Sequence, residues 1–232
     1  FLILGSASPS LIKQASETLA GRIIYHELTP FILNEVGYQD KSIYNLWLRG
    51  GYPESYLAKD NTSSFQWRDA FIKTYLERDI PQLGIRIPSL QLRRFWTMIV
   101  HYHGQLWNGS QIAKSLGVSA PTVKHYLDIL SDTFIVRQLQ PYHLNIKKRL
   151  IKSSKVYIRD TGLLHTLLNN IDLEYLQSHP IAGNSWEGFV IEQIINILPD
   201  GVESYFYRTN AGAGIDLVLI DRDRVIGVEI KY

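Results

Sequence analysis

The sequence predicts a mixed fold, in which α/β segments stand at both ends of a largely helical middle. Apolar runs at the two ends, Phe1–Gly5 and Val228–Tyr232, are typical of buried strands. Between them, apolar residues recur at helical spacing in the stretches 71–80 and 92–102. The 232-residue chain is 45% hydrophobic and 20% charged, which is ordinary globular composition and excludes a disordered chain.

The first α/β block begins with the strand-like run Phe1–Gly5. Ser8 and Pro9 then provide a good helix start, and Gly21 suits the end of that helix. A buried strand at an end of a chain needs neighbours to satisfy its backbone hydrogen bonds. We therefore expect this chain to be a piece of a longer protein.

Composition narrows the classes of function. The chain has no cysteine, which excludes disulfides, thiol catalysis and zinc sites built on cysteine. No apolar run approaches the roughly 20 residues that span a bilayer, and no signal peptide is visible. We expect a cytoplasmic protein with no membrane partner. The net charge of +2 is too small to argue for nucleic acid without local clustering.

Residues 110–140 carry a more specific pattern. Two short apolar stripes, at 112–116 and 123–130, flank a turn at Gly117, and the strand-like segment 134–139 follows. Two short helices, a tight glycine turn and a following strand predict a winged helix-turn-helix. The side chains that would meet a nucleic-acid groove are Ser119, Thr122, Lys124 and His125. The alternative is a winged-helix fold used only for packing.

A basic segment follows this motif, at 145–159. It holds six basic residues and no acid: Lys147, Lys148, Arg149, Lys152, Lys155 and Arg159. Such a run could neutralise several phosphates, and Lys147, Lys148 and Arg149 are the residues predicted to bind nucleic acid. The alternatives are a solvated loop or a surface for an acidic protein partner.

The C-terminal part is predicted as a helix at 184–198 and strands at 203–208, 214–220 and 225–231. With a hairpin turn at 221–224, Asp216 faces Glu229 across the two strands, and Lys231 shares their face. Paired carboxylates repel unless a cation lies between them, so Asp216 and Glu229 are candidate ligands of Mg²⁺. Lys231 could orient the attacking water or stabilise charge on a phosphate.

A third acid, Glu187, falls on the apolar stripe of the predicted helix, whereas Glu192 falls on the opposite side. An acid on an apolar stripe is costly unless it is paired or binds metal. Glu187, Asp216, Glu229 and Lys231 are therefore the candidate catalytic residues. The alternative is a half-exposed hairpin whose charged residues face solvent.

Several segments together resemble one protein family. They include 5–9, 19–22, Leu46–Pro53, Gly117–Val123, Lys148–Leu150, Lys155–Leu164, Trp186–Glu187, Ile215–Val218 and Val228–Lys231. The chain resembles bacterial and archaeal ATPases of the AAA+ class that carry a C-terminal domain of unknown function. In that family a winged helix precedes a domain similar to PD-(D/E)xK nucleases.

The resemblance implies three parts: a remnant of an AAA+ ATPase core at 1–45, a helical and winged-helix domain at 46–145, and a truncated α/β domain like restriction endonucleases at 146–232. It also implies nucleotide-sensing roles for Ser6 and Arg22. No phosphate-binding loop is present, so ATP is expected to bind only to the full-length protein. Relatives often carry Glu two residues before the Asp, where this chain has Gly214.

The sequence thus predicts nucleic-acid engagement, with Mg²⁺-dependent phosphodiester cleavage as the chemistry of the C-terminal part. The first alternative is a non-catalytic module that docks nucleic acid or protein. The second is an ATP-driven machine that remodels a protein partner.

Overall fold

The computed structural model describes residues 26–142, 152–209 and 212–232. The predicted elements before residue 26 lie outside these ranges, as do the candidate residues Ser6, Arg22, Lys147, Lys148 and Arg149. Within the described ranges the fold is mixed α/β, as predicted. No described helix is long and apolar enough to cross a membrane.

Helices make up most of the first two thirds of the described chain. In chain order they are α1 (Leu33–Val36), α2 (Asp40–Arg49), α3 (Pro53–Tyr56), α4 (Asn61–Thr74), the π-helix η1 (Tyr75–Asp79), α5 (Ile80–Gln82), α6 (Ser89–Val100), α7 (Gly109–Leu116), α8 (Ala120–Asp132), α9 (Thr161–Leu167), α10 (Leu173–Ser178) and α11 (Ala182–Ile195). The helical spacing at 71–80 is realised by α4 and η1. Pro81, which has no N–H to donate, lies two residues after the end of this wider turn.

The described strands form one six-stranded sheet in the order β1-β3-β2-β4-β5-β6. The strands are β1 (Gln105–Leu106), β2 (Val136–Pro141), β3 (Lys155–Ile158), β4 (Glu203–Arg208), β5 (Gly214–Asp221) and β6 (Arg224–Val228). All pairs are antiparallel except β2 with β4, which are parallel. That parallel pair joins the strands of the middle of the chain to the C-terminal strands.

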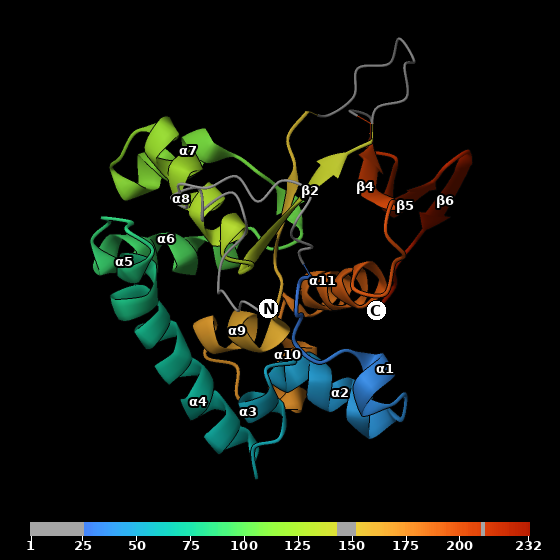
Figure 1. Cartoon of the computed structure of the whole chain (residues 1–232), viewed down its shortest axis with the longest axis horizontal. Coiled ribbons are helices and arrows are strands. Elements are labelled where there is room, and N and C mark those ends of the chain that lie inside the picture. The colour runs from blue at the N-terminus through green and yellow to red at the C-terminus, as the bar shows by residue number, and fades with distance from the viewer. Residues whose placement is uncertain (1–25, 143–151, 210–211) are drawn as a thin grey trace.

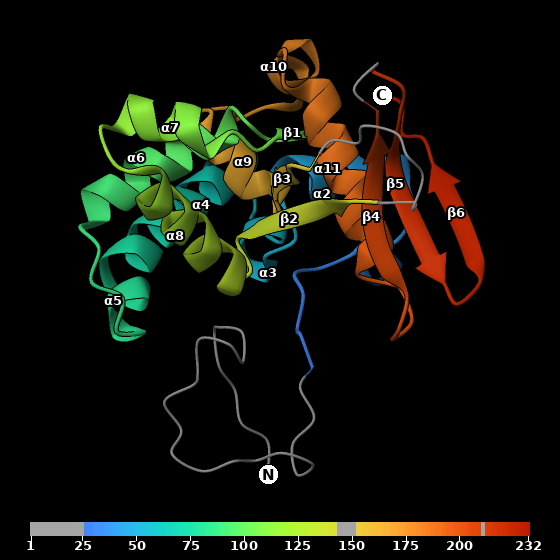
Figure 2. The same ribbon diagram turned by 90° about the horizontal axis from the view of Figure 1, so that it is seen from above.

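Two cores lie on different parts of this sheet. The larger one packs η1 and α6–α9 against β2 and β3, around Trp96, Leu127 and Val156. The smaller one packs α11 against the C-terminal strands, around Ile191 and Phe206. Helices α5–α8 therefore gather at one end of the molecule and β4–β6 at the other, as Figures 1 and 2 show from two directions.

Candidate functional site

The predicted pair of short helices is present as α7 and α8. Gly117 ends α7 with φ 69°, the left-handed conformation that favours glycine. Ser119 caps α8, since its Oγ accepts a hydrogen bond of 3.2 Å from the backbone N–H of Thr122. The local chemistry of the turn is thus as the sequence predicted.

The candidate groove residues lie at the open face of α8. Ser119, Lys124 and His125 are exposed, and Thr122 is half-buried. The two hydroxyls of Ser119 and Thr122 are hydrogen-bonded to each other at 2.7 Å. Lys124 forms an ion pair with Asp128 one turn later, with Nζ 2.7 Å from Oδ1. Of the four, His125 alone makes no polar side-chain contact with the described chain.

The C-terminal hairpin has the predicted register. Leu217 pairs with Val228 and Asp221 with Arg224, and the pairing ends one step before Asp216 and Glu229. The strand β6 ends at Val228, however, and the predicted continuation to 231 is not strand.

A β-bulge between β4 and β5 directs Asp216. Tyr205 pairs with Val218 and Tyr207 with Ile215, so Asp216 and Leu217 together stand opposite Phe206. A bulge bends the strand and changes the direction of a side chain. Leu217 packs in the core beside α11, and Asp216 lies near the same core, where its Oδ2 accepts a hydrogen bond of 3.0 Å from the N–H of Ile230.

Lys155 of β3 brings Glu187 and Asp216 together. Its Nζ lies 2.8 Å from Glu187 Oε1 and 3.7 Å from Asp216 Oδ1, and its side chain is only 8% exposed. The hydroxyl of Tyr157 also donates to Glu187. Burial and the charge of Glu187 together raise the pKa of that phenol, so it stays a donor. A single ammonium group thus lies between two carboxylates and offsets one of their two negative charges.

The remaining two candidates point to solvent. Glu229 and Lys231 have side chains 57% and 81% exposed, and their charged atoms are 3.8 Å apart. Within the described ranges, no polar contact joins Glu229 to Asp216, and no group of three acids or histidines is arranged to hold a metal. The structure therefore brings together Glu187 and Asp216, with Lys155 that was not predicted for this place.

Two members of the basic segment are not solvated. Lys155 and Arg159 lie at the two ends of the buried stretch that contains β3, with both side chains at most one tenth exposed. The interpretation of 145–159 as one phosphate-binding surface is wrong for these two residues, because each is held by acids within the fold. Lys152 is exposed.

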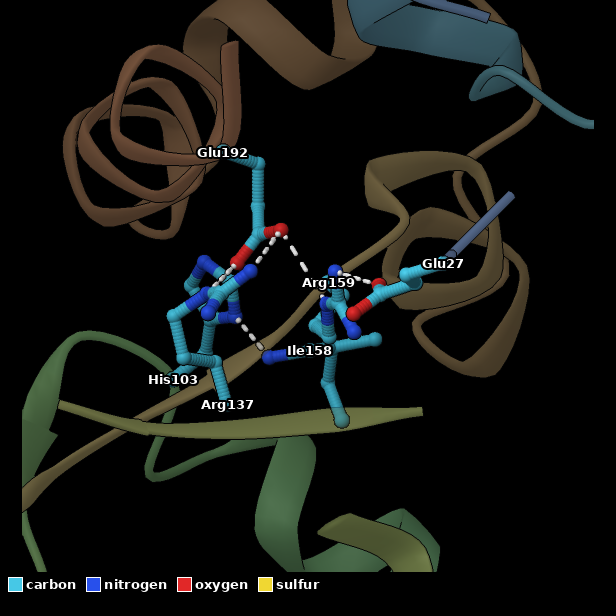
Figure 3. Close-up of polar contacts among 6 residues, drawn as sticks. All are labelled: Glu27, His103, Arg137, Ile158, Arg159 and Glu192. Carbon is cyan, nitrogen blue, oxygen red and sulfur yellow. Dashed lines mark hydrogen bonds and ion pairs between the residues drawn. The ribbon is translucent and has the colours of Figure 1, made fainter. Parts of the chain in front are cut away.

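Glu192 is also buried, although its helical phase predicted the side opposite the apolar stripe. Figure 3 shows its carboxylate between the guanidinium groups of Arg137 and Arg159. Arg137 binds both carboxylate oxygens, with Nη2 2.9 Å from Oε2. Burial would raise the pKa of Glu192, but the two arginines hold it below its usual value. The helix α11 is covered on this side too, by β2 and β3.

Arg159 extends this network to the start of the described chain, since its Nη2 lies 2.5 Å from Oε1 of Glu27. Beside the network, His103 is fully buried, and its Nδ1 accepts a hydrogen bond of 3.0 Å from Ile158 N–H. Burial lowers the pKa of His103 to about 3, so it is neutral. A signal for the network was available in the sequence: Arg137 and Arg159 each adjoin apolar strand residues, where an unpaired charge is costly.

One further polar group lies in the core. Ser185 Oγ accepts a hydrogen bond of 3.0 Å from Trp47 Nε1 and lies 2.7 Å from His165 Nε2, while His165 Nδ1 lies 3.1 Å from the carbonyl of Leu48. The Leu48 carbonyl can only accept, so His165 Nδ1 carries the ring hydrogen, and Nε2 of the neutral ring accepts the hydroxyl hydrogen of Ser185. A serine–histidine pair can serve nucleophilic catalysis, but all three side chains are fully buried. The group therefore links α2, α9 and α11 rather than meeting a substrate.

The chain is thus a mixed α/β protein with an exposed helix pair at one end and a buried acid–lysine cluster at the other. Residues 40–174 match a family described as a domain of unknown function (DUF8612), and 182–232 match a second one (DUF4143). Because the first match spans more than half of the chain, the protein belongs to the DUF8612 family.

Two mycobacterial proteins are similar over the whole chain. They are uncharacterized proteins of Mycobacterium tuberculosis (Rv2008c) and Mycobacterium bovis (Mb2031c), each 50% identical over 231 residues. The chain spans about half the length of these relatives, 52% of each. No solved structure matches the chain.

Proposed function

We propose that this chain binds duplex nucleic acid through a winged helix formed by α6, β1, α7, α8, β2 and β3. In favour of this, the elements follow one another in the order of a winged helix, with β3 paired to both β1 and β2. The exposed N-terminal turn of α8 is then the part that enters a groove, and Lys147, Lys148 and Arg149, which follow β2 in the sequence, are the proposed phosphate contacts.

The charge distribution carries this proposal. Residues 80–159 hold twelve Lys and Arg against two acids, whereas the rest of the chain holds twelve against twenty. Arg137, Lys155 and Arg159 are paired with acids within the fold, which leaves nine other basic residues in this stretch. The net charge of +2 therefore hides a strongly basic middle and an acidic remainder. Phosphate neutralisation by Lys and Arg supplies most of the affinity of sequence-independent binding, so the basic middle is the part suited to nucleic acid.

The test is fluorescence anisotropy of a labelled 20-base-pair DNA duplex, titrated with the purified chain at several salt concentrations. The logarithm of the affinity should fall linearly with the logarithm of salt, with a slope of about −0.9 for each phosphate contact. Replacing Lys147, Lys148 and Arg149 by Ala should weaken binding about equally for all duplexes and lower the slope accordingly. An affinity that does not change with salt would refute the proposal.

A second candidate is Mg²⁺-dependent phosphodiester cleavage by Asp216, Glu187, Glu229 and Lys231. The observation that favours it is that Glu187 of α11 and Asp216, beside the bulge, lie 2.8 and 3.7 Å from the same Lys155 Nζ. Against it, Lys155 already offsets one of the two negative charges of these acids. Residues 160–232 also hold eleven acids against four Lys and Arg, and such an acidic part repels phosphate. The non-catalytic binding module is therefore the function we favour.

Cleavage can be tested directly on plasmid DNA with added Mg²⁺. If the cluster is catalytic, Asp216→Asn should abolish cleavage and leave duplex affinity the same or higher, because it removes one negative charge near phosphate. Binding without cleavage in both proteins would support the binding module.

For the full-length protein we propose, from the resemblance to AAA+ ATPases, that ATP hydrolysis drives the module and that Ser6 and Arg22 sense the nucleotide. A protein partner of such an ATP-driven machine is the alternative to nucleic acid.

A further inference from the structure

We infer that the winged helix binds duplex nucleic acid by its backbone, without reading the base sequence, and that Asp128 limits its affinity. This inference rests on the proposed nucleic-acid binding and specifies its substrate class. It follows from three observations on α8 and the helices around it.

The first observation is the chemistry of the open face of α8. Bidentate recognition of a base uses Arg or Lys on guanine, or Asn or Gln on adenine. The exposed and half-buried positions of the first two turns hold Ser119, Ala120, Pro121, Thr122, Lys124 and His125. Only Lys124 belongs to the bidentate set, so this face has little to offer to base edges.

The second observation is that the polar groups of this face are already engaged. Ser119 caps the helix and shares a hydrogen bond with Thr122. Lys124 donates to both oxygens of Asp128, at 2.7 and 3.1 Å. Asp128 also accepts a hydrogen bond from β2, where Gln138 Nε2 lies 3.3 Å from its Oδ1. The carboxylate therefore remains beside the groove face even when Lys124 moves to a phosphate.

The third observation is that four exposed cations of the proposed winged helix and the segment before it make no ion pair within the described chain. Arg86, Arg94, Lys114 and Lys152 are exposed, and none makes an ion pair with an acid of the described chain. Arg94 lies on α6, which contacts α8 through the hydrogen bond of 3.0 Å between Tyr126 and Gln91. Lys114 lies on α7. In Figures 1 and 2 these helices stand together at one end of the molecule.

Together these features separate the two parts of recognition. Contacts to phosphate fix a protein on the duplex and carry no sequence information, whereas contacts to base edges carry it. Here the cations without an acid partner are those suited to phosphate. On the helix that would read bases, Ser119, Thr122 and Lys124 are already hydrogen-bonded within α8. The acid Asp128 opposes the approach of the backbone at the same place.

The experiment measures anisotropy with several 20-base-pair duplexes of shuffled sequence, and also selects binders from a random duplex pool. Dissociation constants should agree within about threefold, less than the roughly fivefold or greater effect of one good base contact. Arg94→Gln and Lys114→Gln should each lower the salt slope by about 0.9, whereas the matched change Arg224→Gln on β6 should leave it unchanged. Asp128→Asn should tighten binding about twofold to fivefold for every duplex.

The possible failures are distinguishable. An enriched sequence motif whose preference is lost in Thr122→Val or His125→Ala would overturn the inference and leave nucleic-acid binding intact. Salt slopes that are unchanged in Arg94→Gln and Lys114→Gln would also overturn it. So would weaker binding by an Asp128→Asn protein whose circular dichroism spectrum shows that it keeps its fold. Absence of salt-dependent binding to any duplex would remove the proposed function itself.

Discussion

Replacing Glu192 by Gln should destabilise the fold strongly, because it removes the negative charge of a buried ion network. Glutamine has nearly the same shape as glutamate, so no cavity forms. The glutamine amide would keep one oxygen acceptor and present an NH₂ group to a guanidinium that also donates. Removing one member of a buried ion pair costs about 3–5 kcal/mol, because the partner charge is left uncompensated. Two arginines depend on Glu192, but the Arg137 side chain is still 21% exposed and water can recover part of the loss. We therefore expect the lower end, about 3 kcal/mol.

Urea unfolding followed by circular dichroism measures this loss. With a slope of about 2 kcal/mol per molar urea, the midpoint should fall by about 1.5 M. The matched control is Glu203→Gln on β4, an exposed acid whose change should stay within about 0.5 kcal/mol. A loss below about 1 kcal/mol for Glu192→Gln would refute the view that the carboxylate is charged and needed by both arginines.

The dependence on pH gives an independent check of the same reasoning. The folded-state pKa of Glu192 lies below the ordinary value of 4.5, so its stabilising effect is present above about pH 4.5 and is lost as the pH falls through the lower, folded-state pKa. The difference in unfolding free energy between the wild type and Glu192→Gln should narrow below about pH 4.5. A difference that widens in acid would contradict a lowered pKa.

Three further predictions concern the cores and the acid cluster. Ser185→Ala leaves Trp47 Nε1 and His165 Nε2 unpaired and should cost about 2–4 kcal/mol in thermal or urea unfolding; a neutral change would contradict the assigned hydrogen bonds. Burial lowers the pKa of both His103 and His165 to about 3, so stability should fall as the pH drops from about 6.5 toward 4, and His103→Gln should flatten that fall. Lys155→Met removes the cation between two carboxylates and should create Mn²⁺ binding, measured by calorimetry, that is weaker or absent in the wild type; equal binding by both would show that Lys155 does not compete with metal.

The local features of this fold could be predicted from the sequence. The turn at Gly117 and the cap at Ser119 follow from the conformational freedom of glycine and from the hydroxyl of serine, and both are confirmed. The hairpin register is confirmed as well, because a short turn fixes which residues of β5 and β6 stand opposite each other.

The long-range pairs could not be predicted in the same way. Lys155 and Glu187 are 32 residues apart, Arg137 and Glu192 are 55 apart, and the partners meet only because β2 and β3 lie under α11. The helical phase predicted that Glu192 faces solvent, because the sequence spacing does not show that other elements cover α11 on two sides. The bulge that turns Asp216 escapes prediction because it depends on how β5 pairs with β4, whereas the turn fixes only the pairing with β6.

The parallel pairing of β2 with β4 has a consequence for how this protein can be divided. The two family matches meet between residues 174 and 182, yet Gln140 and Pro141 of the first pair with Tyr205 and Phe206 of the second. A chain cut at that boundary would leave β2 with an unpaired edge, and such edges recruit other chains and aggregate. One sheet therefore joins the two segments that sequence comparison separates, and we expect a fragment that ends at this boundary to aggregate more readily than the whole chain.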